Sequence, residues 1–221
     1  MATIKYWGHA CFAITSLDGP RILVDPYLPG GLRGAFKYEP ITDEVEVVLV
    51  THEHSDHNSV EGLSGQPLVL RTSGVVQGVS FVAIPAKHDP LEGRERGDIN
   101  LFVWETDGLR FCHLGDLGHP LTPEQAELVG SPDVLFIPTG GHFTIDPPTA
   151  RRVVTQLQAR VTIPMHYLTP RLKFPPQYRL APVEAFTEGL TRVVRVGGPV
   201  WEVSPHTLPA EPTVVVLEAV E

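Results

Sequence analysis

The 221-residue sequence predicts an α/β protein of the α+β type, in which two packed β-sheets carry helices on their outer faces. Strand-like apolar segments come in two batches along the chain, and each batch is followed by helix-like segments. No linker or low-complexity segment separates the batches, and the proline-rich loop at 168–182 is too short to divide domains. We therefore expect a single domain over residues 1–221.

Strands dominate the first third of the chain. We expect them at residues 4–16 and 21–25, on either side of an Asp-Gly-Pro turn. A glycine-rich loop follows at 30–39. The run at 45–50 (VEVVLV) is apolar nearly throughout, which indicates a strand buried on both faces.

The rest of the chain mixes strands with a few helices. Asp107-Gly108 predicts a tight hairpin turn, because this dipeptide supplies the positive φ that such turns need. Helices are predicted at 123–129, 147–158 and 182–190, and the first two open with a proline behind a Thr or Asp cap. Further strands are predicted at 67–70, 79–84, 99–105, 109–113, 134–138 and 161–164.

Composition limits the possible partners and the compartment. A formal net charge of −9 argues against the broad basic face that binds duplex nucleic acid or an anionic membrane. The N-terminal sequence lacks the basic head and long apolar core of a signal peptide, and no apolar run approaches the roughly 20 residues that span a bilayer. We therefore expect a cytoplasmic protein. Cys11 and Cys112 are expected to be small buried side chains.

The densest cluster of functional residue types is LVTHEHSDHNSV at 49–60, directly after the buried apolar run. In a near-extended chain His52 and His54 point the same way, as two ligands of one metal ion require. Asp56 and His57 follow the turn and can face a second ion. Imidazole and carboxylate suit Zn²⁺, Fe²⁺ and Mn²⁺, and the motif holds no thiolate, so a structural zinc site of the cysteine type is not expected.

Three more metal-binding residue types follow predicted strands: His88, Asp116 and His166. Alone, each histidine would be interpreted as an ordinary loop residue and the aspartate as a turn cap. Together with the first motif they favour metal ligands, because two coordination spheres need more than four side chains.

The order of these motifs resembles the metallo-β-lactamase superfamily over nearly the whole chain. The resemblance covers ILVDP around Asp25, then THEHSDH, an isolated His, a Gly-Asp turn and a late His. WGHACF and IPMHY are similar to segments of a small bacterial branch that includes ascorbate-6-phosphate lactonase-like hydrolases. The resemblance implies a four-layer αββα sandwich of two mixed sheets, with Asp25 supporting the His-rich loop rather than binding metal. It assigns one metal to His52, His54 and His88, the other to Asp56, His57 and His166, and the bridging position to Asp116.

The expected cofactors are two divalent metal ions, zinc in the first place, with manganese or iron as alternatives. A pair of such ions can hold hydroxide and polarise a carbonyl oxygen, so no Ser or Cys nucleophile is needed. No GxSxG or Cys-His pattern is present. We expect a metal-dependent hydrolase that cleaves a small ester, lactone or related bond, with Asp56 as the catalytic residue that orients the hydroxide.

The expected substrate is a small molecule. His142, beside two glycines, is a candidate donor to a developing oxyanion, and Arg94 and Arg96 in the charged loop 89–98 suit a small anionic substrate. A phosphodiesterase or nuclease, a dimetal oxygenase and a non-catalytic metal-binding module are the alternatives. The sequence leaves open a homo-oligomer and the roles of His9, His113 and His119.

Overall fold

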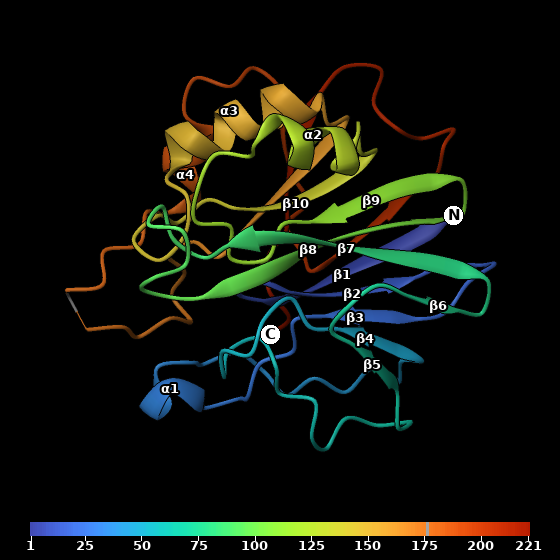
Figure 1. Cartoon of the computed structure of the whole chain (residues 1–221), viewed down its shortest axis with the longest axis horizontal. Coiled ribbons are helices and arrows are strands. Elements are labelled where there is room, and N and C mark those ends of the chain that lie inside the picture. Colours follow the sequence, from blue (N-terminus) through green and yellow to red (C-terminus); the bar gives the residue numbers. More distant parts are fainter. Residues whose placement is uncertain (176) are drawn as a thin grey trace.

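The computed structural model describes residues 1–175 and 177–221, so Pro176 in the proline-rich loop lies outside the described residues. Two β-sheets pack face to face, with β1–β5 below and β7–β10 above in Figure 1. Both sheets are mixed. This arrangement confirms the predicted fold class.

The six-stranded sheet has the order β13-β1-β2-β3-β4-β5. Pairing is antiparallel from β13 to β3 and parallel from β3 to β5. Its strands are β1 (Ala2–Gly8), β2 (Cys11–Thr15), β3 (Ile22–Val24), β4 (Val47–Leu49), β5 (Leu68–Leu70) and β13 (Val200–Val203).

The eight-stranded sheet has the order β12-β14-β11-β10-β9-β8-β7-β6. Pairing is parallel from β12 to β9 and antiparallel from β9 to β6. The Asp107-Gly108 hairpin is confirmed, since Thr106 pairs with Leu109 across it. The strands are β6 (Gly74–Val76), β7 (Val79–Lys87), β8 (Asp98–Thr106), β9 (Leu109–His113), β10 (Val134–Pro138), β11 (Val161–Met165), β12 (Val193–Arg195) and β14 (Thr213–Val216).

Helices α2 (Pro123–Val129), α3 (Pro147–Leu157) and α4 (Val183–Thr187) cover the outer face of the eight-stranded sheet (Figure 1). The predicted starts at Pro123 and Pro147 are confirmed: Thr122 and Asp146 cap them by accepting backbone N–H groups. α4 is shorter than the predicted 182–190. The outer face of the six-stranded sheet is covered mainly by loops, together with the four-residue α1 (Gly31–Gly34). No helix in the described part of the chain is long and apolar enough to cross a bilayer.

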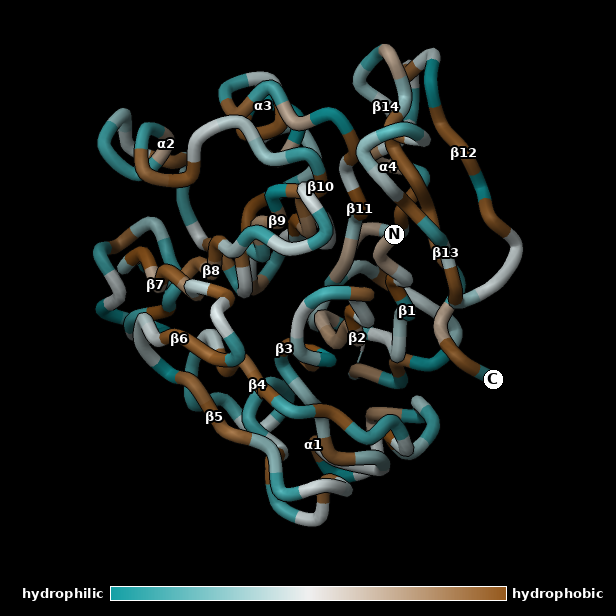
Figure 2. The backbone as a smooth tube through the Cα atoms, turned by 90° about the vertical axis from the view of Figure 1, so that its right-hand side faces the viewer, coloured by the Kyte–Doolittle hydropathy of each residue, from teal (hydrophilic) through white to brown (hydrophobic). Residues whose placement is uncertain are grey.

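The alternation of side chains along each strand produces the layered core. Phe12 and Phe136, from opposite sheets, meet between the sheets with ring centroids 4.5 Å apart. Burying each such ring stabilises the fold by about 1.5–3 kcal/mol. In Figure 2 hydrophobic stretches run along many of the strands, and the connecting loops are mostly hydrophilic or intermediate. Polar side chains at strand ends therefore lie at the rim of the sandwich.

One long strand was expected at 4–16, and this expectation is wrong. The chain turns back between β1 and β2, where Gly8 and His9 have φ values of 119° and 56°. The turn forms a β-hairpin and places His9 between the end of β1 and the start of β2, at the rim of the sandwich. Strands β6, β12, β13 and β14 were not predicted from the sequence.

Candidate metal centre

The predicted ligand residues follow four strands of the two sheets. His52, His54, Asp56 and His57 lie in the loop after β4, and His88 directly follows β7. Asp116 lies three residues after β9, and His166 directly follows β11. The structure thus brings together, at one edge of the sandwich, side chains that are up to 114 positions apart, from His52 to His166.

Histidines 52, 54 and 88 form the first group. One ligand atom from each of the three lies within 4.8 Å of the others. His52 and His88 are buried, whereas His54 is exposed to solvent. Three imidazoles at this separation can bind one divalent ion and leave a coordination position open.

Asp56, His57 and His166 form the second group, and His9 joins them within the same 4.8 Å. Nε2 of His9 lies 3.2 Å from Oδ2 of Asp56, and the His9 ring is fully buried beside His166, with centroids 4.1 Å apart. The sequence alone leaves the role of His9 open. The structure places it against the carboxylate that was predicted to be catalytic.

Asp116 lies between the two groups. Its Oδ2 is 3.2 Å from Nε2 of His88, 3.2 Å from Nε2 of His166 and 3.3 Å from Nε2 of His57. One carboxylate oxygen therefore contacts a histidine of the first group and two of the second. This geometry agrees with the bridging position that the resemblance implies for Asp116, and the bridging role stays a prediction.

Asp25 fixes the tautomers of two of these histidines. Its Oδ1 accepts the backbone N–H of Thr51 at 2.8 Å, and its Oδ2 accepts the Thr51 hydroxyl at 2.7 Å and Nδ1 of His57 at 3.0 Å. Because the only hydroxyl proton of Thr51 goes to Asp25, the 2.9 Å contact from Thr51 Oγ1 to His52 requires that His52 Nδ1 donates. Both rings then present Nε2 to the centre, as metal-binding histidines do.

Donor atoms at the centre, His52 Nε2 and His57 Nε2 among them, are buried without a protein partner, which fits a metal centre. Eight buried side-chain nitrogen and oxygen atoms have no hydrogen-bond partner in the described part of the chain, and six of them belong to this cluster. Buried polar atoms without partners are costly, by about 1–3 kcal/mol each, unless something else satisfies them. The six are His9 Nδ1, His52 Nε2, His57 Nε2, His88 Nδ1, Asp116 Oδ1 and His166 Nδ1.

The electrostatics of the cluster favour positive charge at its centre. Burial opposes charge on His57, but the carboxylates of Asp116 and Asp56 outweigh it and hold the pKa of His57 well above its ordinary value. Burial would raise the pKa of Asp116, whereas His166 and His57 hold it well below the ordinary range. Burial, together with the neighbouring His57, lowers the pKa of His52 to about 3. A divalent cation is the charge that such a set of carboxylates and imidazoles accommodates.

Backbone geometry aims several of these side chains into the site. His9, Asp25 and His166 have φ values of 56°, 47° and 50°, a left-handed conformation that costs non-glycine residues about 1–2 kcal/mol each. Gly118 packs so closely on His88 that a Cβ atom there would overlap the His88 carbonyl group. The site is therefore built by strained backbone and close loop packing, as functional sites often are.

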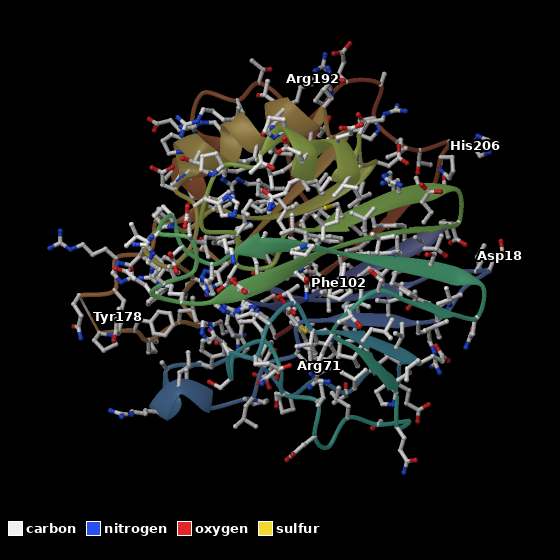
Figure 3. The ribbon with its side chains drawn as sticks, viewed as in Figure 1. Asp18, Arg71, Phe102, Tyr178, Arg192 and His206 are labelled. Carbon is white, nitrogen blue, oxygen red and sulfur yellow. The ribbon has the colours of Figure 1, made fainter. Side chains whose placement is uncertain are left out.

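A cavity of about 730 Å³ opens over the centre. His54, Asp56, His88, Asp116 and His166 line its floor. Three cationic side chains, Arg33, Arg96 and Lys173, line it as well, together with the aromatic side chains of Phe143, Phe174 and Tyr178. Tyr178 is labelled on the left side of Figure 3, the same side as α1.

The residues predicted to bind substrate lie in different places. Arg96 lines the cavity. Arg94 does not: its side chain is 78% exposed and lies 3.8 Å from Glu92, so the cavity gives no support to the expectation that Arg94 binds substrate. His142 is exposed and contacts Phe143 and Tyr178 from outside the cavity lining, so its predicted oxyanion role is not supported either.

Two further histidines, His113 and His119, have structural partners. His113 is buried, and its Nδ1 accepts the backbone N–H of Gly115 at 3.1 Å, so that Nε2 donates to the Ala10 carbonyl at 3.0 Å. His113 thereby joins the Asp116 loop to the His9 turn. Nε2 of His119 accepts the backbone N–H of Lys87 at 3.1 Å.

Comparison with known proteins places the chain in a family. Residues 3–166 match the family model described as a beta-lactamase superfamily domain. A UPF0173 metal-dependent hydrolase of Thermococcus onnurineus is 34% identical over 196 residues, a match that covers 76% of this chain and 86% of the relative. A solved Thermotoga maritima structure, described as a Zn-dependent hydrolase of the metallo-beta-lactamase superfamily, aligns with a TM-score of 0.80 and 35% identity over 99% of this chain and 100% of the other.

More distant structures share the fold alone. The diiron β-hydroxylase CmlA of Streptomyces venezuelae aligns with a TM-score of 0.55 and 18% identity, over 80% of this chain and 48% of the other. Fold and site together define a metal-dependent hydrolase. The chain belongs to the metallo-β-lactamase superfamily.

Proposed function

We propose that the protein hydrolyses a small ester, lactone or related bond at a dinuclear metal site. The observation that carries the proposal is the position of Asp116, whose Oδ2 contacts Nε2 of His88 in the first group and Nε2 of His57 and His166 in the second. A carboxylate shared by two ligand groups is the arrangement that holds two ions close together.

The donor chemistry supports zinc in both positions. Imidazole and carboxylate are ligands of Zn²⁺, and the Thermotoga maritima relative is described as Zn-dependent. Manganese and iron accept the same ligands. The proposed first set is His52, His54 and His88, the second is Asp56, His57 and His166, and Asp116 is shared.

Bound divalent ions would supply a water of lowered pKa and a Lewis acid for the carbonyl oxygen. Asp56 lines the cavity floor and is the residue that can receive a proton from the attacking water and return it to the leaving group. His9 holds Oδ2 of Asp56 at 3.2 Å. The same oxygen lies 3.7 Å from Nε2 of His57, so it faces the histidines of the second group.

The proposal is tested with a substrate panel on metal-loaded protein. The panel contains 4-nitrophenyl esters, simple lactones and bis(4-nitrophenyl) phosphate, assayed before and after removal of metal with a chelator. We expect ester or lactone turnover that is lost with the metal and restored by zinc. Asp116→Asn should lower turnover by about 10²-fold or more, as the loss of a main electrostatic contact does.

Asp107→Asn is the matched control, because Asp107 is an aspartate of the β8–β9 hairpin whose side chain is 1% exposed and whose contacts lie outside the cluster. A preference for the phosphodiester would favour the phosphodiesterase alternative. Turnover that survives removal of the metal would contradict the proposal.

A further inference from the structure

We propose that the cavity accepts substrates in which an anionic group is carried on an aromatic or similarly flat apolar body, and that Arg96 recognises the anion. The inference rests on the proposed function, because it takes the metal cluster as the place where the bond is cleaved. It is carried by three features of the cavity: an aromatic wall, a fixed arginine and two further cations.

Phe143, Phe174 and Tyr178 form the aromatic wall. Their ring centroids are 5.3 to 6.0 Å apart in pairs, so the three rings contact one another. Phe143 and Phe174 are partly exposed and Tyr178 is 39% exposed, and all three line the cavity. Solvent-accessible rings in a concave site favour a ligand that is itself flat and apolar.

The wall adjoins the metal cluster. The Phe143 ring lies edge-on to the ring of His166, with centroids 6.4 Å apart and an interplanar angle of 76°. A flat group packed on Phe143 would therefore lie beside the ligand residues. This position suits the part of an ester or lactone next to the bond that is cleaved.

Arg96 is held at the cavity by its own loop. Asp89, which is 1% exposed, accepts four backbone N–H groups: those of Leu91 and Gly93 on Oδ1, at 2.8 and 3.1 Å, and those of Glu95 and Arg96 on Oδ2, at 3.1 and 2.8 Å. These bonds fold the segment after His88 into a defined loop. A fixed backbone reduces the entropy that Arg96 loses when it binds a ligand.

The Arg96 side chain lies between the wall and solvent. Its guanidinium carbon is 5.8 Å from the centroid of the Phe143 ring, a distance at which the ring face attracts a cation. The carboxylate that it contacts is that of the exposed Glu95, at 3.3 Å. An exposed contact of this kind is weak, so a ligand anion can replace it.

Arg33 and Lys173 add positive charge to the same cavity. Among the described residues, neither has a carboxylate oxygen within 4 Å of its charged group. The chain as a whole has a net charge of −9, so three cations around one cavity are a local departure from its overall charge. Carboxylate and phosphoryl groups share the paired acceptor oxygens that a guanidinium binds.

The test uses three phenyl acetates with different para substituents: a carboxylate, a phosphonate and a neutral carboxamide. With metal-loaded wild-type protein we expect a higher kcat/KM for one or both charged esters than for the carboxamide. In Arg96→Gln the kcat/KM for the preferred charged ester should fall about 10- to 100-fold, because a hydrogen bond to a charged group contributes about 1.5–3 kcal/mol. The carboxamide ester should change by less than about threefold, since it makes no charged contact.

Arg94→Gln is the matched control, because Arg94 lies in the same loop, outside the cavity lining. Neither class of ester should change in it. The two charged esters distinguish the kind of anion. A preference for the carboxylate ester identifies a carboxylic acid substrate, and a preference for the phosphonate ester identifies a phosphorylated substrate. Equal losses for charged and neutral esters in Arg96→Gln would overturn the proposal.

A binding measurement separates this proposal from the proposed function. Benzoate and phenylphosphonate are titrated calorimetrically into metal-loaded wild-type protein and Arg96→Gln. If no ester is cleaved, the proposed function fails, and the subsite stands only if the wild-type protein binds one of these anions at least about tenfold more tightly than the variant does. If esters are cleaved without preference for charge and Arg96→Gln binds both anions as tightly as wild type, the subsite is refuted and the proposed function stands.

Discussion

Asp25→Asn is expected to weaken metal binding at both proposed positions, although Asp25 is not assigned as a ligand. The carboxylate accepts three hydrogen bonds, two from Thr51 and one from Nδ1 of His57, and it is fully buried. An asparagine can keep the bond from the Thr51 backbone on its single oxygen. Its NH₂ group would then face the Thr51 hydroxyl and the His57 N–H, two donors that the carboxylate accepts.

The expected size of the effect follows from these contacts. Each hydrogen bond to the buried carboxylate contributes about 1.5–3 kcal/mol, and the variant loses two. The His57 ring is then free to present a different nitrogen, and the chain from Asp25 through Thr51 to His52 is broken. The loss of contacts that orient metal-binding histidines lowers metal affinity by about 10- to 100-fold.

The assay is competition for zinc between the protein and a chromophoric chelator. Circular dichroism at the assay temperature ensures that only folded protein is compared. Asp107→Asn is the control: it also removes a buried carboxylate that accepts backbone N–H groups, including that of Asp18, which is labelled at the right-hand end of Figure 3. If Asp25→Asn binds zinc as tightly as wild type does, the orienting role assigned to Asp25 is wrong.

Two further predictions concern single carboxylates. Asp56→Asn should leave the protein folded and lower kcat by about 10²-fold or more, the range of general acid–base losses, and a near-native kcat would refute the catalytic role. Burial would raise the pKa of Asp107, but the N–H groups of Leu17 and Asp18 and the terminal ammonium outweigh it and lower that pKa. The carboxylate therefore stabilises the fold above its unfolded pKa of about 3.9, and this contribution is lost as the pH falls through the lower folded value. In urea titrations, wild type should exceed Asp107→Asn in unfolding free energy at pH 7 and lose that advantage towards pH 2; a difference that does not vary with pH would contradict the assignment.

The sequence predicted the ligand cluster because strand ends can be recognised locally. Apolar runs mark the buried strands, and β4, β7, β9 and β11 all end at the same edge of the sandwich. His88, Asp116 and His166 each follow such a run, and the structure gathers them around the 52–57 loop. The assignment of each residue as a ligand stays a prediction.

The parts that the sequence did not predict depend on tertiary structure. His9 lies at a turn inside a long apolar run, and the available signal was Gly8, whose φ of 119° few other residues adopt. Arg33 in α1 and Lys173 in the proline-rich loop are far apart in the chain, and their shared cavity exists only after folding. Short strands such as β12 and β13 carry too few residues for a clear alternation.

Metal content per chain decides whether the centre is dinuclear. Purified wild-type protein and the double variant His52→Ala/His54→Ala are saturated with zinc and freed of excess metal. The bound zinc in each is then measured by elemental mass spectrometry. Both histidines are assigned to the first position, so we expect close to two zinc ions per wild-type chain and close to one in the double variant. One ion or fewer in wild type, or an unchanged content in the double variant, would contradict a dinuclear centre built from these residues.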